Sequence, residues 1–77
     1  MGYQMASYEG KYVRLASEID GAEGIEVGDV FFKDRTGVDL TQPHGWEYDV
    51  WVRVEDGKRF KLPKDARSHF EVVADMG

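Results

Sequence analysis

The chain has 77 residues, of which 42% are hydrophobic and 13% aromatic. A chain of this length forms one small hydrophobic core, which excludes a second domain and a large catalytic cleft, and its apolar content excludes a disordered protein. It contains no cysteine, so disulfides, thiolate zinc sites and cysteine nucleophiles are absent. The net charge of -5 argues against a protein that mainly neutralises nucleic-acid phosphates.

The N-terminal segment, residues 1–8, is predicted to be a flexible leader ahead of a single domain at residues 9–75. In the alternative, Tyr3, Met5 and Tyr8 lie across a hydrophobic groove. The segment lacks the charged and apolar regions of a signal peptide, and no apolar stretch approaches the roughly 18 residues of a membrane helix. We therefore expect a cytoplasmic protein without membrane contact.

Strand patterns begin close to the leader. Residues 11–17 alternate polar and apolar side chains, with Val13 and Leu15 facing inward. A second strand is predicted at residues 30–32, which are Val, Phe and Phe. A turn signal follows it, and residues 38–45 are expected to form a loop or a ragged edge strand.

Residues 18–29 hold five acidic residues, three glycines and no basic residue. This composition predicts a long acidic loop rather than a helix, anchored to the core by Ile19 and Ile25. Because residues 1–32 carry six acidic residues against two basic ones, we expect this part of the chain to attract a basic protein partner. The residues assigned to that contact are Glu18, Asp20, Glu23 and Glu26.

The clearest hairpin joins residues 46–54 to residues 58–63. A two-residue turn would place valines and cations on one face, so we predict a three-residue loop in which Gly57 has a positive φ. This register pairs Val52 with Phe60 and turns the apolar residues of the hairpin toward the core. The exception is Trp51, which is predicted to face solvent.

An exposed Trp51 would stand beside cations, an arrangement that is enriched in contact surfaces through ring packing and cation–π attraction. The alternative is that the leader or the acidic loop covers its ring. The second predicted partner surface comprises Trp51, Arg53, Arg59 and Lys61.

Pro63 is expected to end the hairpin ladder. A short polar turn, which can be a single helical turn, then precedes a last strand with Phe70 and Val72 or Val73 facing inward. The predicted fold is all-β, with five strands and at most one helical turn.

The order of these elements resembles an SH3-like barrel: a first strand YVRL, a long acidic loop, a second strand VGDVFF, the hairpin VWVRVEDGKRFKL, a proline and short turn, and a closing strand FEVV. The resemblance covers roughly residues 10–74, and its sharpest part is RFKLP to HFEVV. It implies a single five-stranded SH3-like barrel with a short helical turn before the last strand. The short, acidic, cysteine-free chain is also similar in style to small SH3-like accessory proteins of bacteria and their phages.

SH3 domains that bind proline-rich peptides use a residue set that this chain matches only in the acidic loop and Pro63. Asp49 and Val50 occupy the positions where a tryptophan pair would open the third strand. The resemblance therefore implies protein binding without implying proline-rich ligands.

Five of the ten cations lie within residues 53–64, and together with Trp51 they resemble a nucleic-acid patch. Acidic residues bring residues 46–64 to a net charge of only +1 (five basic, four acidic), which is typical of a solvated charged face. A nucleic-acid-binding barrel is therefore the alternative function. A structural subunit that offers residues 38–45 as an edge strand is a third.

No catalytic or metal-binding motif is present. His44 and His69 lie in no metal-ligand spacing, and the acidic loop lacks the spacing of a calcium loop. There is no nucleophile motif or glycine-rich phosphate loop, and so small a barrel has little room for a water-excluded pocket. The prediction is a non-enzymatic protein-binding module without cofactor or metal, whose oligomeric state the sequence does not define.

Overall fold

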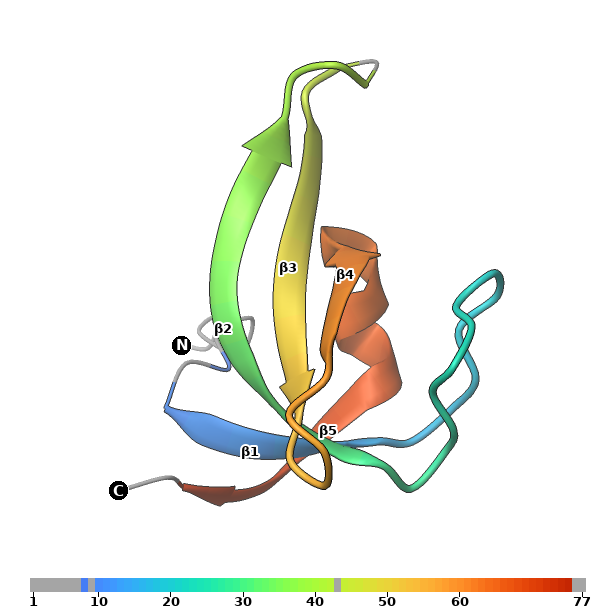
Figure 1. Cartoon of the computed structure of the whole chain (residues 1–77), viewed down its shortest axis with the longest axis vertical. Helices are drawn as coiled ribbons and strands as arrows, with labels where there is room; N and C mark the ends of the chain where they lie inside the picture. The colour runs from blue at the N-terminus through green and yellow to red at the C-terminus, as the bar shows by residue number, and fades with distance from the viewer. Residues whose placement is uncertain (1–7, 9, 43, 76–77) are drawn as a thin grey trace.

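The computed structural model describes residues 8, 10–42 and 44–75. The five strands form one antiparallel sheet in the order β4-β3-β2-β1-β5 (Figure 1). This confirms the all-β class and the helical turn before the last strand. No helix in the described ranges is long and apolar enough to cross a membrane. The elements in chain order are β1 (Lys11–Leu15), β2 (Val30–Asp39), β3 (Trp46–Arg53), β4 (Arg59–Pro63), the 3-10 helix η2 (Lys64–His69) and β5 (Phe70–Asp75).

The sheet is open, which corrects the expectation of a closed barrel. Its edges are β4 and β5, and no ladder joins them within the described residues. Pro63, at the end of β4, has no N–H to donate, and η2 separates the two edge strands along the chain. β1 and β5 cross the lower ends of β2, β3 and β4, so the bent sheet wraps its own core (Figure 1).

The core lies inside this bend and confirms the inward positions of Val13, Leu15 and Phe70. The expected burial of Val72 or Val73 is wrong, because these side chains are 46% and 42% exposed on an edge strand. The register between β1 and β5 also shifts at this point, which interrupts the inward alternation. The buried apolar cluster comprises Val13, Leu15, Phe31, Trp51, Leu62, Ala66 and Phe70.

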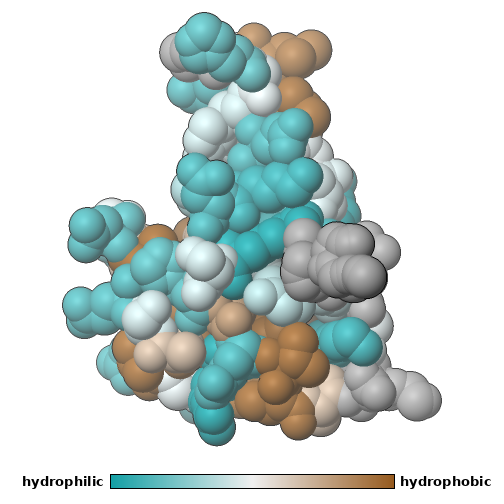
Figure 2. Space-filling view, turned by 180° about the vertical axis from the view of Figure 1, so that it is seen from behind, coloured by the Kyte–Doolittle hydropathy of each residue, from teal (hydrophilic) through white to brown (hydrophobic). Residues whose placement is uncertain are grey.

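β2 is longer than predicted, because the expected turn after residue 32 is strand. It pairs with β3 as far as Asp39 opposite Trp46, with a register shift between Lys33 and Arg35. Residues 38 and 39 therefore belong to β2, and residues 40–42, 44 and 45 lie between β2 and β3. The two long strands project beyond the rest of the molecule as a hairpin (Figure 1), and the space-filling view from behind shows the same projection (Figure 2).

The β3–β4 register differs by one residue from the predicted one. Val52 pairs with Arg59 and Trp51 with Phe60, and residues 54–57 form a four-residue loop. The Arg53 N–H donates to the Lys58 carbonyl at 2.9 Å, closing this loop. A one-residue shift exchanges the two faces of a strand.

Trp51 is consequently in the core, and the prediction that it faces solvent is wrong. Its side chain is 0% exposed and stacks on Phe70, with ring centres 4.3 Å apart. Tyr8, the last residue of the predicted leader, packs against Trp51 at 5.9 Å between ring centres, while residues 1–7 lie outside the described residues. Trp46 and Tyr48, which were expected inside, lie half-buried on the opposite face of β3.

Gly57 has a φ of 71°, which confirms the predicted left-handed position. No atom lies within 4 Å of a Cβ built at this residue, so a substitution there strains the backbone without a steric clash. We expect Gly57→Val to lower the free energy of unfolding by about 1 kcal/mol or more. Gly57→Asn, which tolerates this conformation better, is the matched control. Urea denaturation checks both variants, and an unchanged midpoint for Gly57→Val would contradict the loop geometry.

Candidate functional site

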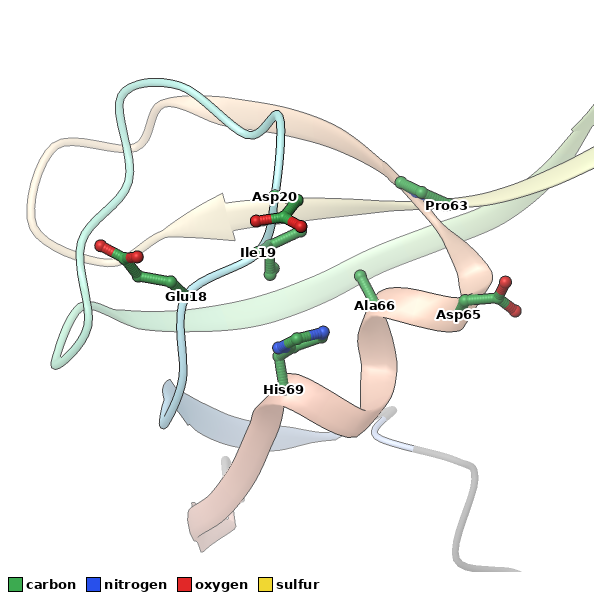
Figure 3. Close-up of a pocket in the computed structure, with 7 residues that line it drawn as sticks. All are labelled: Glu18, Ile19, Asp20, Pro63, Asp65, Ala66 and His69. Carbon is green, nitrogen blue, oxygen red and sulfur yellow. The ribbon is translucent and has the colours of Figure 1, made fainter.

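A groove of about 280 Å³ lies between the acidic loop, residues 18–29, and η2 (Figure 3). The side chains of Ile19, Ala66 and His69 point into the space between the loop and the helix (Figure 3). Glu18 and Asp20 stand on the loop side, whereas Asp65 points away from the groove on the far side of η2 (Figure 3). The groove therefore combines an apolar floor with an acidic rim on the loop side. Its full lining is Glu18, Ile19, Asp20, Pro63, Asp65, Ala66 and His69.

The acidic loop is anchored to the core by apolar side chains. Ile19 and Ile25 pack against the buried cluster, which confirms the anchors predicted from the sequence, and Ala22 joins them. These contacts fix the loop wall of the groove while leaving the acidic side chains outside.

Arg53 clamps the same loop to the β3–β4 turn. Its guanidinium donates to the Gly24 carbonyl at 2.7 Å and to Asp29 Oδ2 at 3.0 Å. It also donates to both carboxylate oxygens of Asp56. These Arg53 hydrogen bonds are the main reason that the pKa of Asp56 falls to about 2. The structure therefore places Arg53, which was predicted to face a partner, in a contact within the chain.

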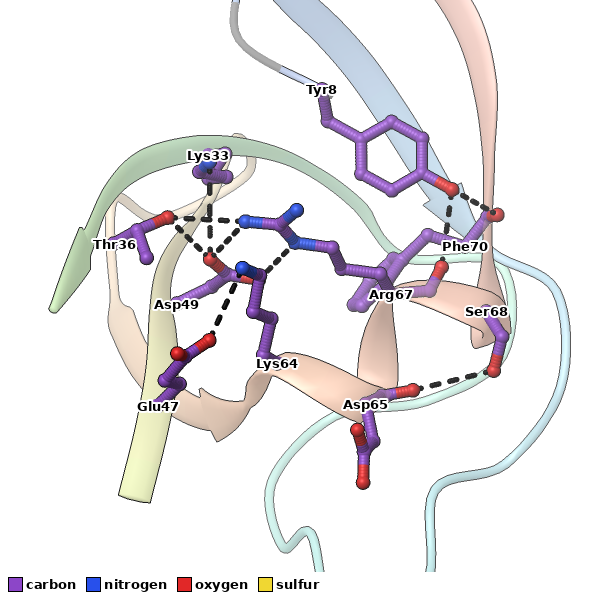
Figure 4. A network of polar contacts seen from close by, with 10 residues as sticks. All are labelled: Tyr8, Lys33, Thr36, Glu47, Asp49, Lys64, Asp65, Arg67, Ser68 and Phe70. Carbon is purple, nitrogen blue, oxygen red and sulfur yellow. Dashed lines mark hydrogen bonds and ion pairs between the residues drawn. The ribbon is translucent and has the colours of Figure 1, made fainter. Parts of the chain in front are cut away.

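η2, the other wall, is held by a buried charge cluster that the sequence did not reveal (Figure 4). Asp49 is 0% exposed and accepts hydrogen bonds from Arg67 Nε at 2.7 Å and Nη2 at 2.8 Å. The Thr36 hydroxyl donates to the same carboxylate at 2.6 Å, and Lys33 Nζ lies 3.8 Å away. Tyr8 adds a hydrogen bond from its hydroxyl to the Arg67 carbonyl. These contacts tie η2 to β2 and β3.

Four of the five cations of the predicted nucleic-acid patch are paired with carboxylates, and the fifth, Lys58, lies over the ring of Phe60. Arg59 forms an ion pair with Asp34, and Lys61 Nζ lies 3.6 Å from Asp39 Oδ2. Arg59 and Lys61 lie on the outer face of the sheet, whereas Trp51 and Arg53 belong to the opposite face of β3. The structure therefore does not bring the four residues of the predicted surface together.

Four carboxylates of the acidic loop, unlike most cations of the predicted nucleic-acid patch, have no ion-pair partner among the described residues. Glu18, Asp20, Glu23 and Glu26 are exposed, and none of them forms an ion pair with another described residue. Glu18 and Asp20 line the groove, whereas Glu26 lines a separate polar cleft beside Arg53. Asp29, at the end of the loop, is paired with Arg53. Four unpaired carboxylates thus lie close together in the loop, and the partner contact assigned to them stays a prediction.

Sequence reasoning missed the η2 side of the groove. The position of Pro63 before a polar turn was the available signal, but it did not show that Ala66 and His69 face the acidic loop. His69 Nδ1 lies 2.9 Å from the Ser17 hydroxyl. Both groups are on the surface, and no third side chain among the described residues orients the imidazole, so this pair lacks the arrangement of a nucleophilic site.

Asp49 should make stability depend on pH in the acid range. Its burial raises its pKa, but hydrogen bonds from Arg67 and Thr36 outweigh burial and hold the pKa below the usual value. A carboxyl with a lowered folded pKa stabilises the fold above its unfolded pKa of about 3.9, and that contribution is lost as the pH falls through the folded pKa. We expect urea midpoints to decrease below about pH 4. A flat profile down to about pH 2.5 would contradict the cluster.

Comparisons with protein-family models, curated proteins and solved structures found no match to this chain. Within the described ranges, no three His, Cys, Asp or Glu side chains are placed to hold a metal ion. The site is therefore interpreted from its own side chains. They offer an acidic, partly apolar groove between two fixed walls.

Proposed function

We propose that this chain is a non-enzymatic protein-binding module that holds a basic segment of a partner protein in the groove between the acidic loop and η2. The observation that carries the proposal is the distribution of ion pairs. Asp34, Asp39 and Asp49, outside the loop, are paired within the chain. Six acidic side chains form no ion pair with another described residue, and four of them, Glu18, Asp20, Glu23 and Glu26, lie in the acidic loop, while Glu55 and Asp65 lie elsewhere. These four loop charges are available to an external cation, and complementary charge steers such encounters.

The shape of the groove supports a peptide segment rather than an inorganic ion. Ile19, Pro63 and Ala66 give it an apolar lining suited to an aliphatic side chain, and Glu18 and Asp20 stand within reach of a flanking arginine or lysine. Both walls are fixed by contacts to the core or to buried charges, so little ordering is needed on binding. A leucine with arginine neighbours is the simplest ligand of this kind.

The nucleic-acid alternative finds less support. Arg59, Lys61 and Lys64 each have a carboxylate partner on the surface of the sheet. Phosphate binding would have to displace those partners. The resemblance to small SH3-like accessory proteins of bacteria and phages stays a prediction, supported by the order of the elements and the position of η2.

The test is a titration with a short peptide that carries leucine between arginines. We expect saturable binding that weakens as salt is added, because exposed charges are screened. Glu18→Lys combined with Asp20→Lys should weaken it at least about tenfold. Glu55→Lys, at an exposed acidic residue outside the groove, is the matched control and should retain more than half of the affinity. Equal losses in the two variants, or no binding at low salt, would reject the proposal.

A further inference from the structure

The outer face of the sheet carries two aromatic rings and a carboxylate around the ammonium group of Lys61. Lys61 Nζ lies 4.3 Å from the ring centre of Tyr48 and 5.8 Å from that of Trp46. Asp39 Oδ2 lies 3.6 Å from the same nitrogen. The register brings these groups together, since Asp39 pairs with Trp46 and Lys61 pairs with Val50, two residues along β3 from Tyr48.

The side chains around the Lys61 ammonium are held in place by contacts that do not involve Lys61. The Tyr48 ring lies against the backbone of Gly37, where an added Cβ would come within 2.6 Å of the ring. The second oxygen of Asp39, Oδ1, accepts the Thr41 backbone N–H at 3.0 Å as well as its hydroxyl. The rings of Trp46 and Tyr48 are 6.0 Å apart and tilted by 36°. Without the lysine side chain, two aromatic rings and a carboxylate therefore stay close together on the outer face of the sheet.

Lys61 is held in this cluster by charge and by its ring contacts. Its side chain is 47% exposed, so its ammonium stays partly in water and water satisfies N–H donors that the rings do not. A primary ammonium carries three N–H donors, which aromatic faces satisfy less well than water does. A quaternary ammonium has no donor to satisfy, and its methyl groups spread the positive charge over aromatic faces.

We propose that Trp46, Tyr48 and Asp39 form a binding site for a quaternary ammonium group, and that Lys61 of the same chain occupies this site when no ligand is bound. The site is separate from the acidic groove and does not depend on its function. Its ligand is either a small free cation or a trimethylated lysine side chain, which present the same trimethylammonium chemistry. Because Lys61 must leave first, its presence lowers the apparent affinity.

The experiment titrates tetramethylammonium chloride into the intact chain and into Lys61→Ala, and follows the two indole N–H signals by NMR. Trp46 lies at the site, whereas Trp51 is buried in the core and serves as an internal reference. We expect a saturable shift of the Trp46 signal alone, with binding about tenfold tighter in Lys61→Ala. Lys58→Ala is the matched control, because Lys58 lies over Phe60 instead, and it should bind like the intact chain.

An overturning result would be a linear shift, equal shifts of both indoles, or the same affinity in the intact chain and Lys61→Ala. Sodium chloride at the same concentrations should leave the Trp46 signal in place. A peptide with trimethyl-lysine, compared with the same peptide carrying unmodified lysine, then separates the sources. Binding of the trimethylated peptide at least tenfold tighter than tetramethylammonium indicates a protein side chain, and equal affinities indicate a free cation.

Discussion

Asp49→Ala is expected to lower the free energy of unfolding by about 3–5 kcal/mol, because it leaves buried cations without their carboxylate. Arg67 loses two hydrogen bonds, and the side chain of Lys33 is almost fully buried 3.8 Å from the missing oxygen. For a domain of this size the melting temperature should fall by roughly 12 °C or more. Thermal denaturation measures this directly.

Asp34→Ala is the matched control for that variant. It also removes a carboxylate from an arginine, but Asp34 and Arg59 meet on the exposed outer face of the sheet. Exposed pairs contribute between about 0 and 1 kcal/mol. A loss in Asp49→Ala no larger than that of Asp34→Ala would contradict the buried cluster, and with it the account of how η2 is positioned.

Trp51→Ala should have an effect of similar size, about 3–5 kcal/mol, since it removes the largest side chain of the core. The ring is fully buried against Phe70 and Tyr8, so truncation leaves a cavity. Trp51→Phe should cost clearly less, because the indole N–H has no hydrogen-bond partner among the described residues and its removal relieves a buried donor. Urea denaturation of the three proteins gives the comparison.

Trp46→Ala provides the control that distinguishes the two hairpin registers. Trp46 is half-buried on the outer face, and we expect its truncation to cost about 1 kcal/mol. The predicted three-residue loop would reverse this order, with Trp46 inside and Trp51 outside. A larger loss for Trp46→Ala than for Trp51→Ala would therefore overturn the observed register.

Local patterns in the sequence predicted much of the fold. Val13 and Leu15 alternate with polar neighbours in a strand buried on one face, so their orientation followed from period-two spacing. The glycines and acids of residues 18–29 excluded a helix, and Gly57 marked a left-handed turn. Each of these features depends on residues close together in the chain.

The register of β3 was not predictable in the same way. The predicted register, in which side chains alternate between a buried and an exposed face, placed Asp49 toward solvent. Asp49 is buried instead, because its charge is compensated by Lys33 and Arg67, which are far away in sequence. Val50 and Val52 are buried as well, so residues 49–52 are covered on both faces of β3. In such a segment the alternation of apolar and polar residues does not show which face points to the core. The apolar run at residues 50–52 is shorter than the roughly four to eight residues that indicate a strand buried on both faces.

The candidate site was predicted on one side only. Charge counting along the chain located the acidic loop, because five acidic residues lie within residues 18–29 without a basic residue among them. The opposite wall comes from η2, whose placement depends on the hydrogen bonds between Arg67 and Asp49. The η2 side of the groove therefore depends on contacts between segments that are far apart in sequence.

The most direct test of the proposed function is to observe where a basic peptide touches the molecule. Intermolecular NOEs can be recorded from the leucine methyl groups of the peptide with leucine between arginines. They should connect to the methyl groups of Ile19 and Ala66, which line the groove. NOEs to Val72 and Val73 on the exposed edge strand, without contacts to Ile19 or Ala66, would contradict the proposal.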